Sequence, residues 1–127
     1  GASGICFNYN PEVAKQEMDV NYFALLHLIR AFCKTLINNR PSAIVNIISI
    51  GGLSAYPLGA TYCTSKAAAH SLTQSVRAEL LPHDVFVFGV YPGPIDTEGH
   101  FETPVLLLPT FSLFSLSFFS KMLGLQA

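Results

Sequence analysis

Three polar side chains, Ser49, Tyr62 and Lys66, have types and spacing that could support acid–base chemistry. The apolar stretch 43–48 before Ser49 predicts a buried strand, and the Ala-rich sequence from Tyr62 to about Leu81 predicts a helix. Tyr62 and Lys66 are four residues apart, so their side chains share one face of that helix. We therefore expect a hydroxyl, a phenol and an ammonium beyond the carboxyl end of a strand, where open α/β sheets bind ligands.

This set of groups suits the transfer of a hydride to or from a carbonyl carbon, because a proton must then move at the carbonyl oxygen. Free tyrosine titrates near ~10, and an ammonium one helical turn away favours the phenolate form. A serine hydroxyl can hold and polarise the substrate oxygen. We interpret Tyr62 as the acid/base, Lys66 as its tuner and a ribose ligand, and Ser49 as the group that holds the carbonyl. The alternative is a solvated helix start beside a strand that merely ends in serine.

The surrounding elements follow from simple patterns. Asn10-Pro11-Glu12 predicts a helix start, and the helical pattern continues to about Asn39. Its apolar positions cover more than one face, which predicts burial by a sheet and by a partner helix. The apolar runs 43–49 and 85–91 predict strands covered on both faces, with the helix 61–81 between them. The expected fold class is therefore α/β, with a parallel pair as part of a doubly wound sheet.

Composition excludes several classes of function. Half of the 127 residues are hydrophobic and 12% are charged, which is low for a soluble domain. The net charge of −1 gives no indication of a nucleic-acid surface. Cys6, Cys33 and Cys63 show neither metal nor disulfide spacing, which favours a reducing, cytoplasmic compartment. The four histidines have no acidic partner at ligand spacing, so we predict no metal site.

The last segment, 98–127, differs from the rest of the chain. Its part 104–120 is apolar, carries no charge and is interrupted by Pro109, and its length only reaches the lower limit of a membrane span. We expect a segment that covers the substrate or contacts a membrane surface, with a membrane span or a divergent, alternatively spliced sequence as alternatives. The expected organisation is a catalytic unit, 1–97, followed by this apolar tail.

The chain resembles the carboxyl-terminal part of the short-chain dehydrogenase/reductase family over roughly Gly4 to Thr97. The strand-end motif of that family is matched by 44–49, which reads IVNIIS, and its active-site motif by 62–68, which reads YCTSKAA. Its Pro-Gly turn is matched by 92–97, which reads PGPIDT.

This resemblance implies a Rossmann-like fold and hydride transfer between NAD or NADP and a small-molecule secondary alcohol or carbonyl. It implies that the backbone near Ile95 and the Thr97 hydroxyl contact the nicotinamide carboxamide. Asn21 matches the helix asparagine of a proton relay in the family, so Ser49, Tyr62, Lys66 and Asn21 form the expected catalytic set. The cofactor-binding residues that the resemblance implies are Tyr62, Lys66, Pro92, Gly93, Ile95 and Thr97.

The sequence also departs from the family pattern. The glycine-rich phosphate loop is not found, and the Asn-Asn-Ala-Gly segment of the family falls on Gly1-Ala2-Ser3-Gly4 without its asparagines. The chain is therefore expected to be incomplete at its amino side. The alternative function is a catalytically inactive chain that pairs with a complete subunit. We expect association through the two long helices, most simply as a homodimer.

Overall fold

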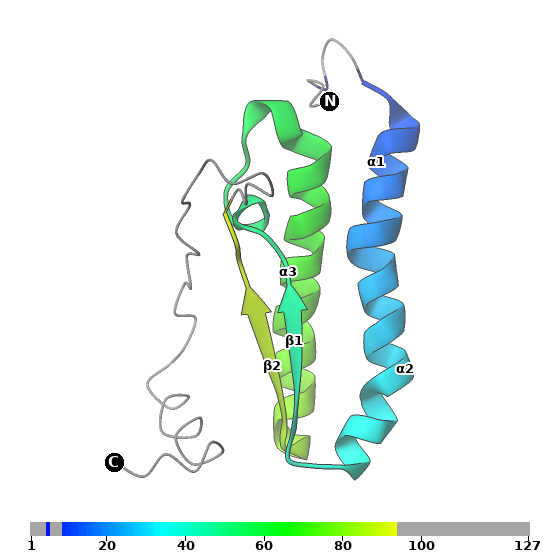
Figure 1. The fold of residues 1–127 in the computed structure, drawn as a ribbon, viewed down its shortest axis with the longest axis vertical. Coiled ribbons are helices and arrows are strands. Elements are labelled where there is room, and N and C mark those ends of the chain that lie inside the picture. The colour runs from blue at the N-terminus through cyan, green and yellow to red at the C-terminus, as the bar shows by residue number, and fades with distance from the viewer. Residues whose placement is uncertain (1–4, 6–8, 94–127) are drawn as a thin grey trace, which may run out of the picture.

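The computed structural model describes residue 5 and residues 9–93. Three helices and two strands form the main elements (Figure 1). In chain order they are α1 (Pro11–Met18), a π-helical turn η1 (Asp19–Phe23), α2 (Ala24–Asn38), β1 (Ser42–Ile47), α3 (Ala60–Leu80) and β2 (Val85–Val90). Short 3₁₀ turns lie at η2 (Ile50–Gly52), η3 (Pro57–Gly59) and η4 (Leu81–His83).

The first helix begins where the sequence predicts. The side chain of Asn10 accepts a hydrogen bond of 3.0 Å from the backbone N–H of Glu12, and Pro11 occupies the first turn. Helix α1, the π turn and α2 then form one continuous rod beside α3 (Figure 1). The rod ends at Asn39, whose side-chain amide donates to the Thr35 carbonyl at 2.8 Å. The predicted long helix is confirmed, but its π turn was not expected.

The two strands are parallel, as predicted, and α3 connects them. Their register pairs Ser42 with Val85 at one end and Ile47 with Val90 at the other. Backbone pairing continues beyond the strands, because the N–H of Ile48 donates to the Val90 carbonyl at 2.8 Å. Further along, the N–H of Ile50 donates to the Pro92 carbonyl at 3.0 Å. The loops that follow β1 and β2 are thereby held side by side at the carboxyl edge of the sheet.

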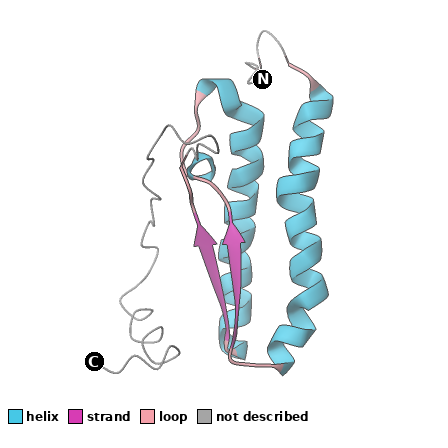
Figure 2. Cartoon of the chain, viewed as in Figure 1, coloured by secondary structure: helices cyan, strands magenta, loops and turns pink. Residues whose placement is uncertain are grey.

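The described long helices lie to one side of the two strands (Figure 2). The hydrophobic core is formed between the strands and the helices α2 and α3. Its buried members are Ile29, Val76, Leu80, Val85 and Val87. On the other face of β1, the side chains of Val45 and Ile47 are 57% and 65% exposed. The prediction that both strands are covered on both faces is therefore wrong for β1, because the described helices cover one face only.

A buried polar contact fixes how α3 lies on the sheet. Asn46 of β1 donates through its side-chain amide to the Thr73 hydroxyl of α3 at 2.9 Å, and both residues are buried. The Thr73 hydroxyl in turn donates to the Ala69 carbonyl at 2.8 Å. Since an unpaired buried polar group is costly, rotation of α3 away from this contact is disfavoured. The amino-terminal turns of α3 are thus directed past the ends of the strands.

The outer face of the α1–α2 rod exposes large apolar side chains among charged ones. Its large exposed hydrophobic side chains are Val13, Val20, Phe23, Leu28 and Phe32. The sequence predicted that this helix is buried on two sides. Within the described chain, only the side that packs against α3 is covered. By length and composition alone the rod could cross a membrane, a test that core helices of soluble proteins also pass.

Candidate active site

Ser49 lies just beyond the carboxyl end of β1, where the backbone enters the turn η2. Its Oγ accepts a hydrogen bond of 3.1 Å from the backbone N–H of Gly51, which caps this turn. A hydroxyl that accepts one hydrogen bond keeps its own proton to donate. The side chain can therefore donate a hydrogen bond to an oxygen atom placed at the edge of the sheet.

Tyr62 and Lys66 lie in the first two turns of α3, which begins at Ala60. The Nζ atom of Lys66 is 5.7 Å from the centroid of the Tyr62 ring, within the range of cation–π attraction. Burial lowers the pKa of the Lys66 ammonium. A partly desolvated ammonium acts more strongly on a neighbouring phenol than a fully hydrated one does. The geometry thus provides a positive charge beside the ring of the candidate acid/base.

Ser49 and Tyr62 meet at a single cavity beyond the ends of both strands. A Cβ atom placed on Gly51 would lie 3.4 Å from Cε1 of Tyr62 and 3.5 Å from Oγ of Ser49. Gly51 therefore lies between the two side chains. The cavity has a volume of about 470 Å³, within the usual range for small-molecule sites. Its described lining residues are Ile48, Ser49, Ile50, Tyr56, Tyr62, Pro92 and Gly93.

The residues that the sequence singled out are placed as follows. Four of them line this cavity: Ser49, Tyr62, Pro92 and Gly93. Lys66 lies near the Tyr62 ring but is not among the described lining residues. Ile95 and Thr97 lie outside the described residues, as does the tail 98–127. Within the described part of the chain, no three His, Cys, Asp or Glu residues are grouped to hold a metal ion.

Asn21 lies in the π turn and reaches α3 rather than the described cavity lining. Its side-chain amide donates to the Ser65 hydroxyl at 2.9 Å, and this hydroxyl donates to the Tyr62 carbonyl at 2.7 Å. The π turn pairs the N–H of Ala24 with the carbonyl of Asp19, five residues earlier, and such turns are frequent at functional sites. Asn21 and Ser65 therefore link the α1–α2 rod to the helical turn that carries Tyr62.

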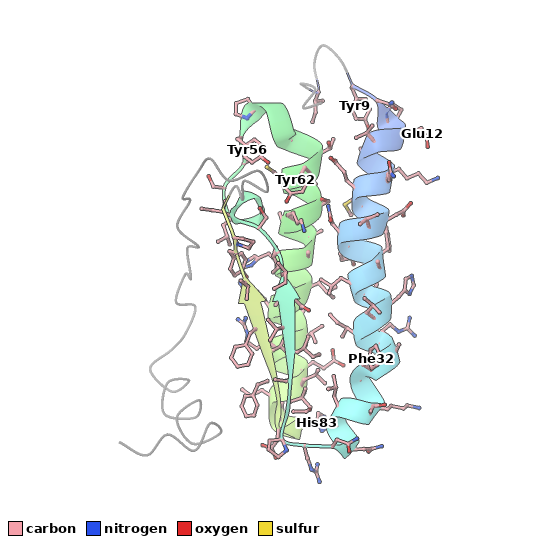
Figure 3. All side chains as sticks on the ribbon, in the orientation of Figure 1. Tyr9, Glu12, Phe32, Tyr56, Tyr62 and His83 are labelled. Atoms are coloured by element: carbon pink, nitrogen blue, oxygen red, sulfur yellow. The ribbon has the colours of Figure 1, made fainter. Side chains whose placement is uncertain are left out.

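Sequence reasoning missed two residues at this site, Ser65 and Tyr56. Ser65 is fully buried, and its position three residues after Tyr62 was a usable sign of contact with the Tyr62 carbonyl. Tyr56 lies in an irregular loop, where no periodic pattern marks the direction of a side chain. Figure 3 shows that Tyr56 and Tyr62 lie at the same end of the structure. Burial, and next the nearby Cys63 thiol, raise the pKa of the Tyr56 phenol, so this group is neutral at physiological pH.

Comparison with known proteins agrees with this fold. The short chain dehydrogenase family model matches residues 3–103. The chain is 36% identical over 100 residues to short-chain dehydrogenase virD of Hypocrea virens, covering 75% of this chain and 34% of that protein. A solved short chain dehydrogenase from Burkholderia cenocepacia, in complex with NADP, is 45% identical with a TM-score of 0.72. The alignment covers 81% of this chain and 43% of that one.

A second solved structure, 4-hydroxyisoleucine dehydrogenase complexed with NADH, is 31% identical with a TM-score of 0.69. The alignment covers 77% of this chain and 43% of that enzyme. The chain belongs to the short-chain dehydrogenase family, and it spans less than half the length of these relatives. The resemblance and the α/β, Rossmann-like fold expected from the sequence are thereby confirmed.

The environment of Lys66 gives a direct prediction about its proton. Because burial disfavours the ammonium, Lys66 should titrate below the ordinary lysine pKa of 10.5. At pH values between the lowered pKa of the folded chain and the ordinary lysine pKa, the unfolded chain binds more protons than the folded chain. The free energy of unfolding should therefore rise with pH in this range. NMR titration of the Lys66 ε-methylene signals, assigned with Lys66→Arg, measures the pKa. A titration at or above 10.5 would show that burial does not govern the pKa of this ammonium, and would contradict this description.

Proposed function

We propose that this chain carries the catalytic half of a short-chain dehydrogenase, which transfers a hydride between NAD or NADP and a small-molecule secondary alcohol or carbonyl. The supporting observation is that Ser49 and Tyr62 line one cavity while the Lys66 ammonium lies near the Tyr62 ring. The bound NADP and NADH of the two solved relatives also support a nicotinamide cofactor.

The described residues fit the nicotinamide end of such a cofactor. Ile48, Pro92 and Gly93 provide cavity walls without charge, which suit a flat ring. Lys66 would bind the ribose, and Pro92 and Gly93 would lie beside the nicotinamide. The cofactor, when bound, supplies or accepts the hydride. In the same proposal, Ile95 and Thr97 would bind the carboxamide.

Each side chain of the site has a role in the reduction of a ketone. The Ser49 hydroxyl donates a hydrogen bond to the carbonyl oxygen and polarises it. The carbonyl oxygen would take the phenolic proton of Tyr62, while a bound reduced cofactor would supply the hydride to the carbonyl carbon and so be oxidised. The Lys66 ammonium stabilises the phenolate that remains. Asn21, acting through Ser65, holds the turn of α3 that presents Tyr62, and we propose that it also belongs to the proton relay.

The remaining parts of the chain complete this proposal. The catalytic unit would span 1–97, and the apolar tail 98–127 would cover the substrate or contact a membrane surface. The protein would act in the cytoplasm.

The exposed face of β1, with Val45 and Ile47, favours a second candidate function, in which the chain is inactive and pairs with a complete subunit. Fluorescence titration with NADPH and NADH separates the two, since binding with turnover supports the enzyme, and no binding with co-purification of a longer homologue supports the inactive partner.

The apolar outer face of the α1–α2 rod supports association of two copies through the long helices. Phe32 is 57% exposed on this face, and Figure 3 shows it on α2. Phe32→Glu should leave a monomer, because burying an unpaired carboxylate in an apolar interface is very costly. Sedimentation velocity measures the change, with His83→Glu as a control that adds the same charge on an exposed turn. If the unaltered chain is a stable monomer, the association is refuted.

The acid/base role of Tyr62 predicts a separation of turnover from binding. Tyr62→Phe should reduce turnover by about 10²–10⁴-fold, the usual contribution of a positioned acid/base, and leave cofactor binding nearly unchanged. Consumption of NADPH or NADH with simple ketones measures the first quantity, and fluorescence titration measures the second. Tyr9→Phe, on an exposed tyrosine, is the matched control. Turnover retained by Tyr62→Phe would reject Tyr62 as the proton donor.

A further inference from the structure

The walls of the cavity contain hydroxyl groups but no charged side chain among the described lining residues. Three of the described lining residues have aliphatic side chains: Ile48, Ile50 and Pro92. The polar atoms on its described side chains belong to Ser49 and to the two tyrosines. Outside the lining, the Lys66 ammonium lies near the Tyr62 ring and is partly desolvated. A substrate carboxylate or phosphate in this cavity would therefore lose hydration without a described cation in direct contact, which is costly.

An acidic side chain, that of Glu17, also acts electrostatically on Tyr56. Glu17 of α1 interacts electrostatically with the Tyr56 phenol and raises its pKa, the smallest of the causes after burial, Cys63 and Tyr62. One of its carboxylate oxygens, Oε2, is buried without a hydrogen-bond partner in the described structure. Glu17 therefore offers an anionic substrate group no compensating positive charge on the Tyr56 side of the cavity.

Tyr56 gives the cavity an aromatic surface that is held in place by the backbone. A Cβ atom on Gly59 would overlap the Tyr56 ring, so the ring packs directly on the backbone of the turn η3. The side chain of Tyr56 is 47% exposed, and Tyr56 is one of the residues that line the cavity. An aromatic ring that is fixed from behind and open in front is a good stacking surface for a flat apolar group.

We infer, on the basis of the proposed function, that the substrate is an uncharged aromatic ketone or its alcohol, and that Tyr56 is the residue that selects its ring. The volume of about 470 Å³, part of which the nicotinamide ring would occupy, suits a substrate of one or two rings. Ser49 and Tyr62 hold the carbonyl oxygen, while the aliphatic walls and Tyr56 receive the aromatic group. In this proposal Tyr62 transfers the proton. Tyr56 acts only by contact between its ring and the aromatic ring of the substrate.

Three small ketones test the two parts of this inference separately. Acetophenone and phenylglyoxylate share a phenyl ketone and differ in a methyl group against a carboxylate. Methyl cyclohexyl ketone keeps the methyl group and replaces the aromatic ring by an aliphatic one. Binding of each to the full chain is measured by isothermal titration calorimetry, with and without NADPH, and turnover is measured separately. We expect acetophenone to bind at least about tenfold more tightly than phenylglyoxylate. The carboxylate of phenylglyoxylate would lose hydration in the cavity without a cation among the described lining residues to compensate it.

The role of Tyr56 is tested by two substitutions. Tyr56→Leu should remove the preference for acetophenone over methyl cyclohexyl ketone, a change of about 2- to 10-fold from the loss of one aromatic contact. Tyr56→Phe should retain this preference, because the ring remains. Tyr9→Leu, on an exposed tyrosine, controls for the loss of a tyrosine elsewhere. Circular dichroism of each variant verifies that the helices are intact.

Each outcome separates this inference from the proposed function. Equal or tighter binding of phenylglyoxylate, or no binding of either phenyl ketone, overturns the substrate class. An unchanged ring preference in Tyr56→Leu overturns the role of Tyr56. Tight and selective acetophenone binding without any turnover supports the cavity chemistry inferred here but overturns the proposed hydride transfer. Turnover of phenylglyoxylate alone supports hydride transfer and overturns the uncharged substrate.

Discussion

The site depends on the parallel pairing of β1 and β2 beyond the last residues of the strands. The hydrogen bonds from Ile48 to Val90 and from Ile50 to Pro92 hold two loops together that are otherwise remote in the chain. In a parallel pair, the carboxyl ends lie at the same edge, so Ser49 and the Pro92-Gly93 turn become neighbours. Without this pairing, Ser49 and the Pro92-Gly93 turn would no longer line the same cavity.

Helix α3 brings Tyr62, the proposed acid/base, to this edge, and two polar contacts determine the position of the helix. The Asn46–Thr73 hydrogen bond fixes α3 against the sheet, at a buried location where a lost partner is costly. The hydrogen bonds from Asn21 to Ser65 and from Ser65 to the Tyr62 carbonyl tie its first turns to the α1–α2 rod. The helical turn that carries Tyr62 is thus held from two sides, and such preorganisation would favour the proposed proton transfer.

Features set by local sequence were predictable here, and features set by distant contacts were not. Spacing of four residues placed Tyr62 and Lys66 on one helical face, and Asn10-Pro11 marked the start of α1. The Asn21–Ser65 contact joins residues 44 positions apart, and a one-sequence pattern does not specify such pairs. Burial was overestimated for β1, because an apolar run does not reveal whether the chain itself supplies both covering layers.

The central claim is that Ser49 and Tyr62 converge beside Gly51, and an NMR distance measurement tests it without any assumption about activity. A Cβ atom on Gly51 would lie 3.4 Å from Cε1 of Tyr62, so a Gly51 Hα atom lies close to the ring. The account predicts a nuclear Overhauser cross-peak between the Gly51 Hα and Tyr62 Hε protons in the purified chain. With both signals assigned and the helices intact, the absence of this cross-peak would contradict the account.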